Sequence, residues 1–263
     1  MKHLRPVELF LAVGLATAVG ACGSPTPEAG EGGEASEEPT TDVAPEGGEG
    51  GASSGNPDVD YMTALALMKG HLMVAEELME EGNYAEAEPH IGHPVNELYG
   101  DVEGQLSERD VPQFKDTLNE LHDLSKSAPE SPEMMSQYDE AVAAIDEAIA
   151  AIADDQRQSP EFVMPVIDGL LTTAAAEYEA AIADNTFVEV VEYQDSRGFV
   201  LYAEDLYETV ANEMSQNSPE DHQAIMASFE DLKAAWPSVN PPEAPILEPS
   251  EVYSLVSEIE LRS

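Results

Sequence analysis

Five histidines follow residue 58, and three of them fall within 23 positions: His71, His90 and His93. Glu97 comes four residues after His93, and Glu86 precedes His90 by four. Residues three or four apart on a helix lie on the same face, so these side chains would point to one side. Imidazole and carboxylate groups in this pattern suit a transition metal ion such as iron, copper or zinc. His71, His90, His93 and Glu97 are therefore the first candidates for metal ligands.

Pro94 follows His93 directly and complicates this geometry. Proline cannot donate a backbone hydrogen bond to residue 90, so it either kinks the helix or begins a new one. His93 would then be a helix cap rather than a ligand. In that alternative, His71 is a core residue, and His90 and His93 are surface residues beside the kink.

A second polar cluster lies on a later segment that otherwise packs inward: Glu189, Glu192, Tyr193, Gln194, Asp195 and Arg197. Carboxylates of this region are second choices as metal ligands: Glu192 and Asp195, with Glu177 on the preceding helix. Arg197 is one of only eight basic residues after residue 21, which favours a specific acidic partner such as Glu177. Alternatively, the cluster is a structural ion pair that joins two helices.

The N-terminus has the pattern of an export signal. Lys2 and Arg5 precede an apolar stretch from about Val7 to Ala21, which is too short for a membrane-spanning helix. The stretch ends in Val19-Gly20-Ala21-Cys22, which resembles the lipobox of bacterial lipoproteins. This resemblance implies cleavage before Cys22, lipidation of its thiol, and a mature chain held on a bacterial membrane by acyl chains. In a Gram-negative cell we expect the periplasmic face of the outer membrane. Alternatively, Cys22 is a bystander near an ordinary signal-peptide cleavage site.

The segment after the cysteine predicts a disordered spacer. Residues 23–57 consist almost entirely of Gly, Pro, Ser, Thr, Ala and Glu, with no aromatic residue and no Leu, Ile or Met. Such a segment cannot bury enough apolar area to offset its chain entropy. The sequence therefore predicts a signal peptide over 1–21, a lipidated linker over 22–57 and a folded domain over 58–263.

The folded domain is predicted to be all-α. Apolar residues from Tyr61 to Met79 follow the helical period, and Gly82 ends that helix. Three Ser-Pro-Glu sequences, beginning at residues 131, 159 and 218, favour helix starts in which serine caps the free amides and proline occupies the first turn. Further helices are expected over about 84–107, 110–124, 138–153, 162–183, 188–214, 221–236 and 250–261. No alternating β-branched run with hairpin turns stands between them, so we expect a bundle of seven or eight helices.

Composition excludes several function classes. The net charge of −44 repels phosphate backbones, which argues against nucleic-acid binding. A single cysteine excludes an internal disulfide framework. The chain has no glycine-rich phosphate loop, dinucleotide fingerprint, His-Glu-x-x-His or Gly-x-Ser-x-Gly motif, so an enzyme is not the favoured interpretation.

Two segments resemble imelysin-like domains. The first runs from Glu88-Pro89-His90-Ile91-Gly92-His93-Pro94 to Glu97-Leu98-Tyr99-Gly100-Asp101, and the second is Glu192-Tyr193-Gln194-Asp195-Ser196-Arg197-Gly198-Phe199. The resemblance implies an exported helical bundle that binds iron or a related metal as an accessory to uptake, beside other cell-envelope uptake proteins. The family signature reads Gly-x-His-x-x-Glu, whereas here Gly92 precedes His93 directly and Glu97 is four residues on.

Two functions from different classes remain. The first is a metal-binding lipoprotein, and the second is a metal-free, lipid-anchored scaffold that holds a protein partner. Residues 58–263 carry 45 acids and 8 bases, a net charge of −37, and such a surface attracts cations everywhere. The case for a specific metal site therefore depends on the histidines.

Overall fold

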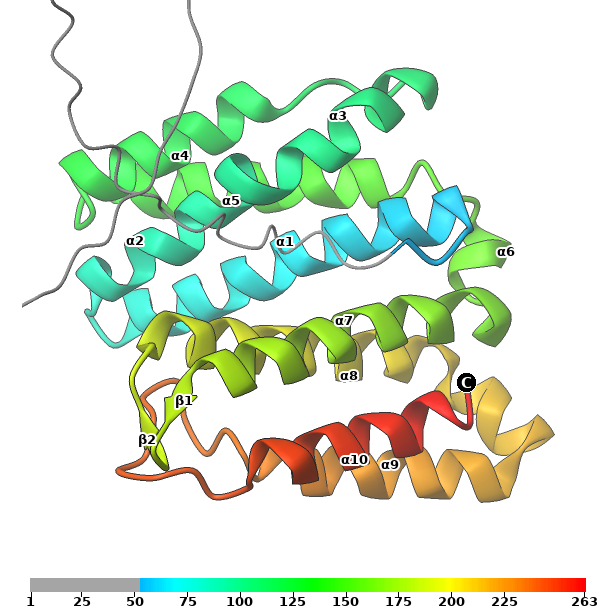
Figure 1. Cartoon of the computed structure of the whole chain (residues 1–263). Helices are drawn as coiled ribbons and strands as arrows, with labels where there is room; N and C mark the ends of the chain where they lie inside the picture. The colour runs from blue at the N-terminus through cyan, green and yellow to red at the C-terminus, as the bar shows by residue number, and fades with distance from the viewer. Residues whose placement is uncertain (1–52) are drawn as a thin grey trace, which may run out of the picture. The chain divides into compact units, whose positions relative to one another are not determined.

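The computed structural model describes residues 53–263, which form an all-α bundle as predicted (Figure 1). The predicted signal peptide, Cys22 and the linker up to residue 52 lie outside the described residues. The elements are α1 Pro57–Glu80, α2 Tyr84–His93, the π-helical turn η1 Pro94–Leu98, α3 Tyr99–Glu108, α4 Lys115–Ser127, α5 Pro132–Ile149, α6 Asp154–Arg157, α7 Pro160–Ala180, β1 Ile182–Ala183, β2 Thr186–Phe187, α8 Val190–Asn217, α9 Pro219–Lys233 and α10 Pro249–Glu260.

The long helices number eight in the described residues, when α2, η1 and α3 are taken as one interrupted helix and the four-residue α6 is left aside. Helix α1 lies in the middle of the bundle and contacts α2, α5, α7 and α8 (Figure 1). Helices α3, α4 and α5 lie on one side of it, and α9 and α10 lie beyond α7 and α8 on the other. This central position explains why α1 is apolar nearly all round, rather than along one stripe.

The turn after α1 folds the chain back as the sequence predicts. Gly82 has a φ of +79°, a left-handed conformation that glycine adopts without strain. The N–H of Gly82 donates to the carbonyl of Met79, and the N–H of Asn83 donates to that of Leu78. This pair of bonds is a Schellman motif, which satisfies carbonyls at the helix end. It returns α2 alongside α1, so that histidines on both helices can meet.

Helices begin at Pro132, Pro160 and Pro219, at the three predicted Ser-Pro-Glu sequences. The predicted capping by serine side chains is wrong, because none of the three serines accepts a capping hydrogen bond through its hydroxyl. The hydroxyl of Ser159 donates instead to Glu161. Proline in the first turn, which needs no N–H there, accounts for the starts without a side-chain cap.

A short hairpin separates α7 from α8 and corrects the prediction that the first of these helices reaches Ala183. Ile182 pairs with Phe187, and Ala183 pairs with Thr186. The two turn residues, Asp184 and Asn185, have φ values of 51° and 59°. Asp and Asn tolerate this left-handed conformation, and two such residues in a row give the tight turn that matches the twist of paired strands.

Several other boundaries differ from the predicted ones, among them the helix expected over 138–153, which spans Pro132–Ile149. Helix α1 begins at Pro57, one residue before the expected start of the folded part, and the side chain of Asn56 caps it by accepting from the N–H of Asp58. The helix expected from residue 110 begins only at Lys115, because Asp110 is left-handed and residues 111–114 are not helical.

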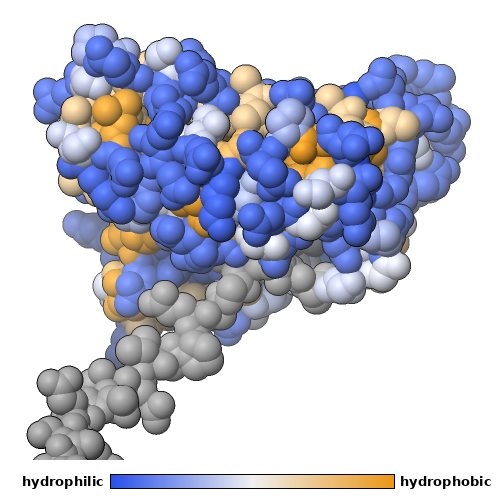
Figure 2. All heavy atoms as spheres, turned by 90° about the horizontal axis from the view of Figure 1, so that it is seen from above, coloured by the Kyte–Doolittle hydropathy of each residue, from blue (hydrophilic) through white to orange (hydrophobic). Residues whose placement is uncertain are grey.

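The surface of the described residues is largely hydrophilic where it is seen from above, with small and scattered hydrophobic spots (Figure 2). This agrees with the 45 acids of residues 58–263. Among the described residues, every helix is too short or too polar to span a bilayer.

Candidate metal centre

Four side chains that can each offer a metal-ligand atom meet inside the bundle. They are His71 on α1, His90 and His93 on α2, and Asp195 on α8, and their ligand atoms all lie within 4.8 Å of one another. The side chains of His71, His90 and Asp195 are completely buried, and that of His93 is 17% exposed. The cluster therefore lies in the interior with one member reaching toward solvent.

Asp195 is the shared partner of the three imidazoles. Its Oδ1 lies 2.5 Å from His71 Nδ1 and 2.6 Å from His90 Nδ1, and its Oδ2 lies 3.2 Å from His93 Nδ1. The rings of His71 and His93 meet edge to face at 4.8 Å between centroids, and Phe199 packs edge-on against His71 at 4.9 Å. The aromatic contact closes one side of the cluster.

Opposing effects act on the pKa of Asp195. Burial disfavours the charged carboxylate and would raise its pKa, but the charges of His71 and His90 and their hydrogen bonds outweigh burial. The pKa of Asp195 is held well below its ordinary value. The cluster therefore contains a buried carboxylate anion between imidazoles. In such an arrangement a metal cation can take the place of the hydrogens that the imidazoles share with the carboxylate.

A close crossing of α1 and α8 brings His71 and Asp195 together. Gly70 precedes His71, and Gly198 comes one turn after Asp195 on α8. A Cβ atom on Gly198 would overlap the carbonyl oxygen of Gly70, and one on Gly70 would lie 2.6 Å from a ring carbon of Phe199. The two backbones therefore touch directly, and this contact allows two short side chains to meet across the helix pair.

The π-helical turn η1 follows His93 and contains Glu97. Pro94 supplies no N–H for the ordinary helical bond, and π turns of this kind are frequent at functional sites. His93 is the last residue of α2, and its Nε2 lies 3.8 Å from Glu97 Oε1. The helix is interrupted at Pro94 by this π turn, yet His90 is fully buried. The alternative that places His90 on the surface is therefore wrong.

The other candidates of the sequence take different places. Glu97, a first candidate, is not one of the four residues; its Oε1 lies 3.8 Å from Nε2 of His93. Glu177 on α7 and Glu192 on α8 are not members of the group either. Arg197 forms a two-pronged ion pair with Glu77, with Nε and Nη2 each 3.0 Å from a carboxylate oxygen, and it also donates to the carbonyl of Trp236. The acidic partner is thus on α1, and the suggestion of Glu177 is wrong.

Three imidazole nitrogens and one carboxylate form a donor set that fits a divalent transition metal ion. Metal–nitrogen and metal–oxygen bonds to such ions are about 2.0–2.2 Å, which places neighbouring ligand atoms roughly 3–3.5 Å apart. The nitrogen–oxygen separations of 2.5 to 3.2 Å around Asp195 would widen slightly to reach this spacing, and the longer separations within the group, up to 4.8 Å, would shorten. Iron, copper and zinc all accept such ligands.

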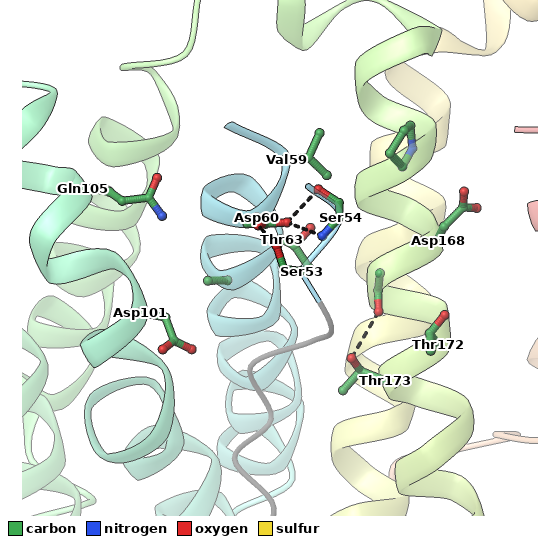
Figure 3. Close-up of a pocket in the computed structure, with 13 residues that line it drawn as sticks. Ser53, Ser54, Val59, Asp60, Thr63, Asp101, Gln105, Asp168, Thr172 and Thr173 are labelled. Carbon is green, nitrogen blue, oxygen red and sulfur yellow. Dashed lines mark hydrogen bonds between the residues drawn. The ribbon is translucent and has the colours of Figure 1, made fainter. Parts of the chain in front are cut away.

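A separate hollow of about 610 Å³ lies between α1, α3 and α7 (Figure 3). Hydroxyl groups and three carboxylates line it, those of Asp60, Asp101 and Asp168, and it shares no residue with the histidine cluster. Ser53 and Ser54 already donate hydrogen bonds to Asp60, at 2.7 and 2.6 Å. This hollow has no imidazole and offers no comparable donor set.

Residues 153–263 match the family model of the iron permease-associated 4-helix bundle domain. The matched segment is less than half of the chain and contains the four long helices α7, α8, α9 and α10. It includes Asp195, whereas His71, His90 and His93 lie before it. No curated protein and no solved structure gives a significant match. The match supports a helical domain related to iron uptake, and it does not point to imelysin-like domains specifically.

Two parts of the site were not assigned from the sequence. Gln194 was placed in the polar cluster without a role, but its Oε1 lies 2.9 Å from His90 Nε2. The crossing of Gly70 and Gly198 was not foreseen either. The signals available in the sequence were Gly70 inside an apolar helix and Gly198 three residues after Asp195. A glycine inside a helix can mark a place where two backbones approach closely.

Proposed function

We propose that this protein binds a transition metal ion, iron foremost, at His71, His90, His93 and Asp195, as an accessory to iron uptake. The observation that carries the proposal is the convergence of three histidines on one buried carboxylate. Burying these charged and polar groups costs free energy that an apolar contact between the same helices would avoid. A bound cation offsets that cost. The match of residues 153–263 to an iron permease-associated domain favours iron over copper or zinc.

We also propose an imelysin-like relationship and a lipid anchor for this chain. An imelysin-like relationship is compatible with the placement of His90, His93 and Glu97 around the π turn. Glu97 would then be a further ligand, beside the four residues of the group. A lipid anchor at Cys22 would hold the helical domain on a bacterial membrane, beside the permease or other uptake proteins of the cell envelope. Binding without chemistry at the ion suffices for such a role.

The test is calorimetric titration of the chain with Fe²⁺ under anaerobic conditions, and with Cu²⁺ and Zn²⁺. We expect one strong site per chain in addition to weak adsorption by the acidic surface. His90→Ala should abolish the strong site, because it removes a buried ligand. His122→Ala is the matched control, since His122 pairs with Glu88 between α2 and α4 and is not among the four. Equal binding by the two variants would refute the proposed site.

The second candidate function is a metal-free scaffold on the membrane. The buried cluster would then be a structural polar network that fixes α1, α2 and α8 in register. This candidate predicts that His90→Ala lowers the melting temperature to the same extent with and without metal. The metal-binding proposal predicts that iron raises the melting temperature of the unaltered chain only, because a ligand that binds the folded state stabilises it.

A further inference from the structure

Two consecutive residues of α8 hold the two nitrogens of one imidazole. His90 Nδ1 lies 2.6 Å from Asp195 Oδ1, and His90 Nε2 lies 2.9 Å from Gln194 Oε1. Gln194 is 1% exposed, so its amide belongs to the interior as fully as the ring that it contacts. The orientation of His90 is therefore fixed from both sides.

Glu86 determines which end of the Gln194 amide faces His90. Gln194 Nε2 lies 3.5 Å from Glu86 Oε2, at the long end of hydrogen-bond distances. A carboxylate only accepts, so the amide NH₂ faces Glu86 and the amide oxygen faces His90. An oxygen acceptor in turn requires a hydrogen on His90 Nε2. The nitrogen of His90 that remains for a metal ion is Nδ1, on the side of Asp195.

We propose that Gln194 is a positioning residue, which keeps the hydrogen of His90 on Nε2 and presents Nδ1 to the bound ion. Glu86 orients Gln194 from the surface, where it lines a hollow that also contains Lys126 and Glu130. The proposal rests on the proposed metal-binding function and deepens it. Metal-binding histidines commonly donate their second N–H to an oxygen that fixes the ring, and loss of that oxygen costs about ten- to a hundredfold in affinity.

The affinity test compares three variants with the unaltered full chain, using Zn²⁺ as the probe in competition with a chelator. Gln194→Met keeps the shape but removes the acceptor, and we expect Zn²⁺ binding to weaken about ten- to a hundredfold. Glu86→Lys should also weaken it, because the ammonium donates to the amide oxygen and turns the NH₂ toward His90. Glu130→Lys makes the same charge change in the same hollow and should have only a minor effect.

Two results would overturn the proposal: Zn²⁺ binding by Gln194→Met as tight as that of the unaltered chain, or an equal loss in Glu86→Lys and Glu130→Lys. Circular dichroism checks that each variant remains helical. Absence of a strong Zn²⁺ site in the unaltered chain is a different result, because it refutes the proposed function itself.

A spectroscopic readout separates positioning from a general loss of structure. Long-range ¹H–¹⁵N NMR of the Zn²⁺-loaded chain should show His90 with a hydrogen on Nε2 and the metal on Nδ1. The reverse assignment would contradict the proposal even if affinity followed the expected order. In the metal-free chain, the N–H signal of His90 Nε2 should be protected from exchange and should lose this protection in Gln194→Met.

Discussion

At the scale of single residues, the candidate site depends on one carboxylate. Asp195 is buried on α8 and accepts from His71 and His90 through the same oxygen atom. A carboxylate with two imidazole donors is stable in the interior only while its partners remain. The same groups can exchange their shared hydrogens for a metal ion, so stability and binding depend on the same atoms.

Asp195→Asn should weaken both stability and metal binding. Removing one partner from a buried ion pair costs about 3–5 kcal/mol. Urea unfolding at pH 7 should therefore show that the variant is less stable than the unaltered chain by about this amount. The pKa of Asp195 is lowered in the folded state, so its contribution is present above its ordinary pKa of 3.8 and is lost as the pH falls through the folded value. The difference between variant and unaltered chain should therefore disappear in strong acid. A constant difference from pH 7 downward through this range would contradict it.

Asp168 should show the opposite pH dependence. Burial raises its pKa from 3.8 to about 6, with Glu260 adding to the increase and the hydroxyl of Ser263 opposing it. Above pH 6 the folded chain holds an ionised carboxylate at a cost, and each unit of pKa shift corresponds to about 1.4 kcal/mol before solvent screening. Asp168→Asn should therefore be more stable by about 1–2 kcal/mol at pH 8.

This gain should shrink as the pH falls and vanish below about pH 4, where Asp168 is protonated in both states. Urea unfolding of both chains from pH 8 to pH 4 measures it. A gain independent of pH would show that the carboxylate charge is not its cause. Metal binding should stay unchanged, since Asp168 lines the separate hollow.

At the scale of elements, a helix crossing and a helix defect bring the ligands together. The crossing of α1 and α8 at Gly70 and Gly198 brings His71 to Asp195, and the π turn η1 lies between His93 and the rest of the interrupted helix. An extra residue in a π turn changes which side chains follow on a given face. The site therefore depends on backbone geometry as well as on its ligands.

Gly198→Ala should disturb both packing and binding. The added methyl group overlaps the Gly70 carbonyl, so α1 and α8 must separate. Overpacking of this kind costs about 1–3 kcal/mol, and the separation moves His71 away from Asp195. We expect a lower melting temperature together with weaker Zn²⁺ binding in the chelator competition.

Gly104→Ala is the matched control on α3, where a Cβ would meet nothing within 4 Å. Alanine favours a helix over glycine by about 1 kcal/mol, so this variant should be slightly stabilised and should bind metal normally. If both glycine variants behaved alike, the close crossing would not be what positions the site.

At the scale of the whole molecule, the candidate ligands come from two parts of the chain, one that matches the family model and one that precedes the match. The segment that matches the iron permease-associated domain contributes Asp195 and Gln194, and helices α1 and α2 contribute the histidines.

The described residues also carry a large excess of acidic over basic residues. With 45 acids and 8 bases in residues 58–263, like charges repel across the whole surface, and ions in solution screen this repulsion.

Salt should therefore stabilise the fold. Raising NaCl from 0.01 M to 0.5 M shortens the screening length from about 30 Å to well below 10 Å, so the melting temperature should rise. The buried cluster is screened much less, and strong metal binding should change less than weak surface adsorption does. Thermal unfolding and titration at the two salt concentrations measure both effects. A melting temperature that falls with NaCl would show that surface ion pairs, rather than repulsion, dominate.

The sequence by itself determined the helical class, most helix boundaries to within a few residues, and the turn at Gly82, because these depend on local spacing, proline and glycine. It also indicated the histidines, since imidazoles are few and clustered in an acidic chain. It did not foresee the hairpin at Asp184-Asn185, because strands of two residues carry no periodic signal, or the missing serine caps, which depend on side-chain rotamers.

Only the tertiary structure decided which carboxylate joins the histidines. Asp195 lies more than a hundred residues from His71 and His90, and the sequence ranked Glu97 ahead of Asp195, Glu177 and Glu192. The choice depends on the angle and distance at which α1 and α8 cross, and therefore on the touching backbones of Gly70 and Gly198. Contacts between distant helices are set by the packing of the whole bundle, which local sequence patterns do not encode.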